Sequence, residues 1–222
     1  HKHQNAVAID IPPYDLQTLM TEANLLTDCF LPVLNDQALS SILKDQYTNA
    51  WSVILSQLPS PAVSLVLRDF HVDNLMLIPG DTSNHQIGLL DFQDARIGPI
   101  AYDIVSLLED ARRDIAEPFA SKMLERYTDA MPLLDMQNFK LWYCVLAAQR
   151  HCKVLGIFSR LAIRDHKTQY LAHLTRVLRL LQKNLEFPVL APLKEWLDQV
   201  IGDRGIPVEI DLVRIRTTLE IS

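Results

Sequence analysis

Two short acidic loops, each placed directly after an apolar run, constrain this chain more than any other feature of its sequence. The run at 63–67 leads into RDFHVDN at 68–74, and the run at 87–90 leads into DFQD at 91–94. Short runs rich in Val, Ile and Leu that are bounded by turn residues predict strands. We therefore expect strands at 63–68, 74–78 and 86–91, with a turn at 79–81, that hold the two acidic loops close together.

Asp69, Asn74 and Asp91 are three oxygen-bearing side chains of these loops that can be directed at one point. A carboxylate at a strand end can orient and deprotonate an attacking hydroxyl, which is the catalytic role expected for Asp69. Asn74 and Asp91 supply an amide oxygen and a second carboxylate, a pair suited to Mg²⁺ on the phosphates of ATP. Each residue alone is typical of a turn or a cap, but the three together indicate a phosphoryl-transfer site.

A different combination of loop residues leaves a second interpretation open. Asp69, His71 and Asp73 alternate along one loop, as the ligands of metal-dependent hydrolases do. This metal-dependent hydrolase interpretation gives no role to Asn74 or Asp91, and it is therefore the alternative.

Neighbouring residues are expected to support or extend the site. Arg68 is expected to anchor the loop, and Asp103, near the start of a helix, to hydrogen-bond the backbone of the catalytic loop. The possible substrate-binding residues are His71, Asp73, Asp94, Arg150 and His151.

Two groups of charged residues have simpler interpretations as helix surfaces. The cationic run from Arg150 to Lys167 is typical of a solvated helix face, and a surface for an anionic or polyhydroxyl acceptor is the alternative. The acidic pair at 109–110 and the arginines at 112–113 are expected to pair with each other along one helix.

The composition limits the class of partner. The chain has 222 residues, of which 49% are hydrophobic, so it can form a sizeable core. Its net charge of -6 argues against a nucleic-acid partner. Without a transmembrane-length apolar run or a signal peptide, we expect no membrane partner and a cytoplasmic location. Cys29, Cys144 and Cys152 have no metal-ligand spacing and are expected to be buried thiols.

The rest of the chain has apolar residues at helical spacing. Helices are expected at 14–34, 38–58, 101–113, 117–130, 136–157, 166–184 and 190–201. Asp36 is expected to cap the second of them, and a strand is possible at 208–212. The expected fold class is α+β and mostly helical, with a small strand cluster that carries the acidic loops.

These motifs resemble the aminoglycoside phosphotransferase and choline kinase-like family, whose members have the protein-kinase-like fold. That family carries His-x-Asp-x-x-x-x-Asn, then Ile/Leu-Asp-Phe/Trp, then Gly-x-x-x-x-Asp. The matching segments are 67–74, 90–92 and 98–103, with Leu67 in place of the family's first His. Longer stretches at 65–76, 88–115 and 148–172 are similar to bacterial anomeric kinases of cell-wall recycling, which phosphorylate N-acetylmuramate and N-acetylglucosamine.

The resemblance implies transfer of the γ-phosphoryl group of ATP, with Mg²⁺, to a hydroxyl of an amino sugar or an aminoglycoside. It also implies that 13–201 form the C-terminal lobe of the kinase-like fold, with 1–12 as a linker from an N-terminal lobe and 202–222 as a tail. Because the chain has no Gly-rich phosphate loop, the N-terminal lobe is expected from the parent polypeptide or from a dimer partner. The non-enzyme alternative is a catalytically inactive solitary lobe that acts as a binding module.

Overall fold

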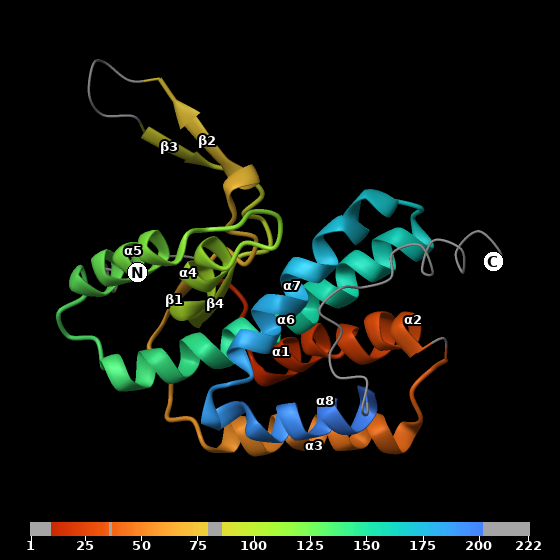
Figure 1. Cartoon of the computed structure of the whole chain (residues 1–222). Helices are drawn as coiled ribbons and strands as arrows, with labels where there is room; N and C mark the ends of the chain where they lie inside the picture. The colour runs from red at the N-terminus through yellow and green to blue at the C-terminus, as the bar shows by residue number, and fades with distance from the viewer. Residues whose placement is uncertain (1–9, 36, 80–85, 202–222) are drawn as a thin grey trace. The chain divides into compact units, whose positions relative to one another are not determined.

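The computed structural model describes residues 10–35, 37–79 and 86–201 (Figure 1). Most of the expected linker, Asp36 and the whole 202–222 tail with its possible strand lie outside these residues. The described residues divide into two compact units, one made of 10–15, 60–79 and 86–146, the other of 16–35, 37–59 and 147–201. The boundaries expected for the lobe, 13–201, coincide with neither unit.

The first unit contains two separate antiparallel sheets of two strands each, which Figure 1 shows as two pairs of arrows. The pairs are β1 (Val63–Val66) with β4 (Arg96–Pro99), and β2 (Leu75–Ile78) with β3 (Gln86–Leu89). The three strands expected from the sequence are confirmed, with ends that differ by one or two residues.

The strand β4 was not expected, because its sequence of Arg, Ile, Gly and Pro is typical of a turn. Gly98 is needed at this position because a Cβ there would lie 2.8 Å from the Cβ of Tyr14. The ring of Tyr14 in turn packs against Tyr102, with centroids 5.0 Å apart. The close approach of these groups is a tertiary requirement that the local sequence does not report.

Three helices complete the first unit: α4 (Ala101–Leu108), α5 (Glu117–Asp129) and the N-terminal part of α6 (Met136–Arg164). Seven of the eight residues of α4 are buried, which makes it the central helix of this unit. It ends at Leu108 and not near 113 as expected. The hydroxyl of Tyr127 on α5 donates to the carbonyl of Ile100, 3.1 Å away, and so ties α5 to the start of α4.

Every regular element among the described residues of the second unit is helical. Its elements are α1 (Leu16–Ala23), a π-helical turn (Leu26–Phe30), α2 (Leu31–Asn35), α3 (Ser41–Ser56), the rest of α6, a 3-10 segment (Thr168–His173), α7 (Leu174–Asn184), a 3-10 turn (Pro188–Leu190) and α8 (Ala191–Ile201). The N-cap of α3 is Ser40, whose Oγ accepts from the amide of Leu43, and not Asp36 as expected. α3 and α8 lie side by side, joined by a hydrogen bond from Trp196 Nε1 to the carbonyl of Leu43 (Figure 1).

The second unit has a buried polar cluster on α6. Lys153 Nζ lies 2.8 Å from Glu22 Oε1, and both side chains are 8% exposed. Gln149 donates to the carbonyl of Leu19 at 3.0 Å and to Glu22 Oε2 at 3.3 Å. The residues of the cationic run at 150, 151 and 153 are all buried, so the solvated-face interpretation is wrong for them. Within the described ranges, no helix combines the length and apolar character needed to cross a membrane.

The cysteines match the expected buried thiols at two of three positions. Cys144 and Cys152 are buried, whereas Cys29 is half-buried, and all three are free thiols. Burial raises the pKa of Cys144 to about 11 and that of Cys152 to about 12.

Replacing Gly156 with Ala is expected to destabilise the second unit. A Cβ at this position of α6 would overlap the backbone of Leu25 and lie only 2.5 Å from its Cβ. Forcing an extra methyl group into such a contact costs about 1–3 kcal/mol. Urea unfolding followed by circular dichroism checks this prediction. Gly88→Ala is the control, because its Cβ would meet the flexible end of Ile78; equal stability of the two variants would contradict the prediction.

Candidate active site

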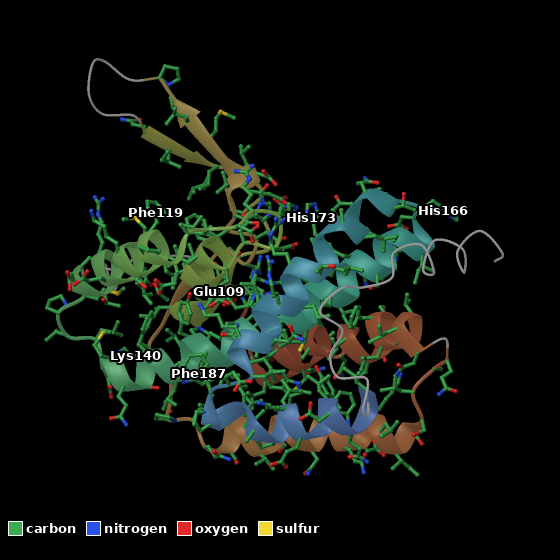
Figure 2. The ribbon with its side chains drawn as sticks, viewed as in Figure 1. Glu109, Phe119, Lys140, His166, His173 and Phe187 are labelled. Carbon is green, nitrogen blue, oxygen red and sulfur yellow. The ribbon has the colours of Figure 1, made fainter. Side chains whose placement is uncertain are left out.

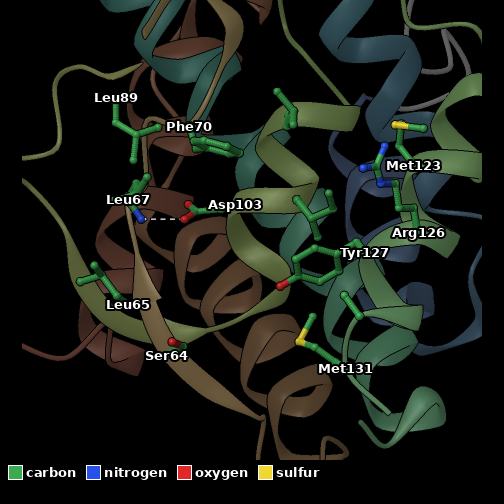
Figure 3. A pocket seen from close by; sticks show the side chains of 13 residues that line it. Ser64, Leu65, Leu67, Phe70, Leu89, Asp103, Met123, Arg126, Tyr127 and Met131 are labelled. Carbon is green, nitrogen blue, oxygen red and sulfur yellow. Dashed lines mark hydrogen bonds between the residues drawn. The ribbon is translucent and has the colours of Figure 1, made fainter. Parts of the chain in front are cut away.

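The loop at 67–74, predicted to be catalytic and called the catalytic loop below, begins where β1 ends, at the buried Val66. The carboxylate of Asp103, on the first turn of α4, accepts a hydrogen bond from the backbone amide of Leu67 at 2.7 Å (Figure 3). It accepts a second hydrogen bond from the backbone amide of Arg68 at 3.0 Å. Asp103 is only 5% exposed, so its carboxylate binds the backbone of the loop in a buried environment. The contact is of the kind that a loop-anchoring role requires.

Both acidic loops contain a residue with strained backbone. Arg68 has a φ of 68° and Asp91 a φ of 57°, in the left-handed region that non-glycine residues rarely adopt. Such a conformation costs about 1–3 kcal/mol and persists only where the surroundings fix it. The guanidinium of Arg68 also donates to the carbonyl of Asp94 at 3.4 Å, which connects the first loop to the second.

Asn74 joins the remaining parts of the site. It ends a 3-10 turn (Val72–Asn74), and its side-chain nitrogen donates to the carbonyl of Asp69 at 2.9 Å. The backbone carbonyl of Asn74 accepts from the backbone amide of Leu90, also at 2.9 Å. Since β2 and β3 pair Leu75 with Leu89, this bond continues the ladder and places Asp91 one residue beyond. The structure therefore brings Asp69, Asn74 and Asp91 to one end of the hairpin.

The donor set at this end of the hairpin fits Mg²⁺. The nitrogen of the Asn74 amide is used in the contact with Asp69, so its oxygen keeps its capacity to bind a cation. The carboxylate of Asp91 is exposed and accepts from Gln93 Nε2 at 2.5 Å. An amide oxygen and one carboxylate are hard donors, and Mg²⁺ completes such a partial shell with waters and phosphate oxygens.

Asp73 lies near three basic side chains. Its carboxylate is 2.5 Å from Arg113 Nη2, 3.8 Å from Arg112 Nε and 4.0 Å from His71 Nδ1. The two acids and the two arginines do not lie along one helix as expected, because α4 ends at Leu108. The side chains of both arginines lie near Asp73. No local signal could reveal this contact, since Asp73 and Arg113 are 40 residues apart.

The geometry does not favour the alternative centre made of Asp69, His71 and Asp73. Among the residues that the structure describes, no three His, Cys, Asp or Glu side chains are grouped so that they could hold a metal ion. The carboxylate of Asp73 pairs with Arg113 instead.

The remaining candidates are placed as follows. Asp94 is exposed at the end of the second loop, and its described contact with the site is made by its backbone carbonyl, which accepts from Arg68. Arg150 and His151 are buried on the part of α6 that belongs to the second unit, where His151 Nδ1 lies 3.2 Å from Asn184 Nδ2. Substrate binding by these three residues stays a prediction.

Comparison with known proteins gives a consistent picture. The model of the phosphotransferase enzyme family matches residues 8–142. Curated relatives named N-acetylmuramate/N-acetylglucosamine kinase include those of Neisseria meningitidis serogroup B, with 35% identity over 88% of this chain and 59% of the relative, and Caulobacter vibrioides, with 33% identity over 88% and 52%. The relative from Pseudomonas aeruginosa is 34% identical over 86% of this chain and 57% of its own length. The chain thus spans a little over half the length of these relatives.

Replacing Asp103 with Ala is expected to release the start of the catalytic loop. The change removes the acceptor of two backbone amides, and each hydrogen bond to a charged group contributes about 1.5–3 kcal/mol. Native-state hydrogen exchange should show much faster exchange of the amides of Leu67 and Arg68, together with lower stability in urea.

Asp135→Ala is the matched control for Asp103→Ala. It also removes an acceptor of two backbone amides, those of Gln137 and Asn138, but at an exposed helix start. Its effect should be near 1 kcal/mol, which is typical of a helix cap. Unchanged exchange at Leu67 and Arg68 in Asp103→Ala would show that the loop does not depend on this carboxylate.

Proposed function

Because the chain belongs to the phosphotransferase enzyme family, we propose that it carries the catalytic and metal-binding loops of an ATP- and Mg²⁺-dependent small-molecule kinase. The acceptor is the anomeric hydroxyl of N-acetylmuramate or N-acetylglucosamine, and an aminoglycoside is the second candidate. The observation that carries the proposal is the position of Asn74, bonded both to the carbonyl of Asp69 and to the strand that leads into Asp91. The names of the relatives support the sugar acceptor.

In the proposed reaction, Asp69 orients the acceptor hydroxyl and takes its proton. The hydroxyl oxygen forms a bond to the γ-phosphorus, and the bond between that phosphorus and the β,γ-bridging oxygen breaks, so ADP leaves. Little covalent chemistry is required of the protein in such a transfer, and positioning supplies most of the rate enhancement. The bonds that fix both ends of the loop, at Leu67 and Asn74, serve this positioning.

Asn74 Oδ1 and the carboxylate of Asp91 would hold Mg²⁺. When bound, the ion neutralises charge on the ATP phosphates. The backbone of Asp91 is left-handed, just after the ladder with β2 ends. The exposed position of this carboxylate leaves it accessible to a nucleotide.

Asp69→Asn is expected to lower kcat by about 10²–10⁴-fold, because it removes the proton acceptor and keeps the shape of the side chain. ADP formation with Mg²⁺ is measured against N-acetylmuramate, N-acetylglucosamine, kanamycin and choline. Asp129→Asn, at the exposed end of α5, is the control and should retain full activity. Normal turnover by Asp69→Asn would sink the proposed mechanism.

The same assay separates the enzyme from a binding module. It is run on this 222-residue chain and on the longest natural polypeptide that contains it, since the chain spans a little over half the length of its relatives. Turnover by either one supports the kinase. Binding of the amino sugars without turnover by both would favour the inactive binding module.

Asp91→Asn is expected to raise the Mg²⁺ concentration that gives half-maximal activity by at least about tenfold. Loss of residues that merely support metal ligands already costs about 10–100-fold in metal affinity, and a ligand should cost no less. The measurement is a Mg²⁺ titration at fixed ATP, with Asp129→Asn again as the control. An unchanged Mg²⁺ dependence would remove Asp91 from the metal site.

A further inference from the structure

An apolar pocket of about 650 Å³ lies directly behind the catalytic loop, within the first unit (Figure 3). One wall comes from β1, the catalytic loop and the end of β3, the floor from α4, and the other wall from α5 and the residues after it. Its volume is in the range of about 300–1,000 Å³ that small-molecule sites occupy. The lining residues that carry the argument are Leu67, Phe70, Asp103, Met123, Arg126 and Tyr127.

The polar groups of the pocket favour an anion. Its two charged lining residues are Asp103 and Arg126, and the carboxylate of Asp103 is already engaged by the amides of Leu67 and Arg68. Arg126 is exposed and, within the described ranges, forms no ion pair. Burial and the charge of Asp103 raise the pKa of Tyr127, so its hydroxyl stays neutral and donates to Ile100. Arg126 is therefore the group that a ligand charge would meet.

The packing of α5 indicates that the apolar wall is incompletely covered. None of its 13 residues is buried, although a helix in a folded domain normally buries an apolar stripe. Met123 and Tyr127 face the pocket (Figure 3), and Phe119, one turn before Met123, is 56% exposed (Figure 2). The apolar side chains of α5 thus line open space that an apolar ligand can fill.

We propose that this pocket binds a small aliphatic carboxylate. The aliphatic chain lies between the wall of Leu67 and Phe70 and the wall of Met123, and the carboxylate pairs with the guanidinium of Arg126, whose planar fork suits that group. The pocket is lined by none of the residues proposed for catalysis or Mg²⁺ binding, Asp69, Asn74 and Asp91, and the proposal does not depend on them. Because Leu67 and Phe70 bracket Asp69 in the chain, the ligand contacts both ends of the catalytic segment.

The test is calorimetric titration of the full chain with octanoate, 1-octanol and octylamine, which share the same chain length and differ in charge. Octanoate should bind saturably, 1-octanol more weakly, and octylamine at least tenfold more weakly than octanoate. Arg126→Gln should weaken octanoate binding about tenfold, to the level of 1-octanol, and leave 1-octanol unchanged, since one charged pair in a partly open site is worth roughly a factor of ten.

Two further variants make the test specific to this pocket. Lys122→Gln, one turn earlier on the same helix and also exposed, removes the same charge and should leave octanoate binding unchanged. Ala130→Trp, at the exposed C-cap of α5, should fill the pocket and abolish binding of all three compounds. The proposal would be overturned by equal binding of octanoate and octylamine, or by normal octanoate binding to Arg126→Gln. It would also be overturned if octanoate showed no saturable binding, and the pocket would then be a site for a protein segment.

Discussion

The geometry of the site depends on one carboxylate, that of Asp103. It sits on the first turn of α4, where the helix dipole favours a negative charge, and it accepts from the two amides at which β1 turns into the catalytic loop. These bonds fix the backbone at Leu67 and Arg68, and so help to hold Arg68 in its left-handed conformation. Since α4 is almost wholly buried, the position of the loop is set by the core of the first unit and not by the loop's own sequence.

A second constraint, the register of β2 against β3, fixes the position of Asp91 relative to the first loop. The side chain of Asn74 fixes the far end of the Asp69 loop, and its backbone continues the pairing of β2 with β3. Strand side chains alternate between faces, so a slip of one residue would turn Asp91 to the other face. The two loops therefore act as one unit, since each bond in the series determines the position of the next.

The parts of the fold that the sequence predicted are those with a local pattern. The three strands next to the acidic loops and α5 were expected on that basis. The contact of Asp103 with the loop backbone was also expected, although its partners lie 35 and 36 residues away. The features it missed involve partners far along the chain. Arg113 pairs with Asp73. The strand β4 was missed because it contains a glycine, Gly98, that is required only by its close packing against Tyr14. The buried Lys153 has its partner 131 residues away, and only the folded chain shows that it is not on a solvated face.

The buried pair of Lys153 and Glu22, together with its neighbours on α6, also fixes how this helix packs. Gln149, Lys153 and Gly156 are spaced by four and three residues and so share one face of the helix. Their contacts advance in the same direction along the first helical segment: to Leu19, then to Glu22, then to Leu25. The two segments therefore run parallel. A buried ion pair contributes little net stability, but a shift of α6 by one turn would leave a buried charge unpaired and press a side chain against the Leu25 backbone. The polar cluster and the glycine together select a single packing of the second unit.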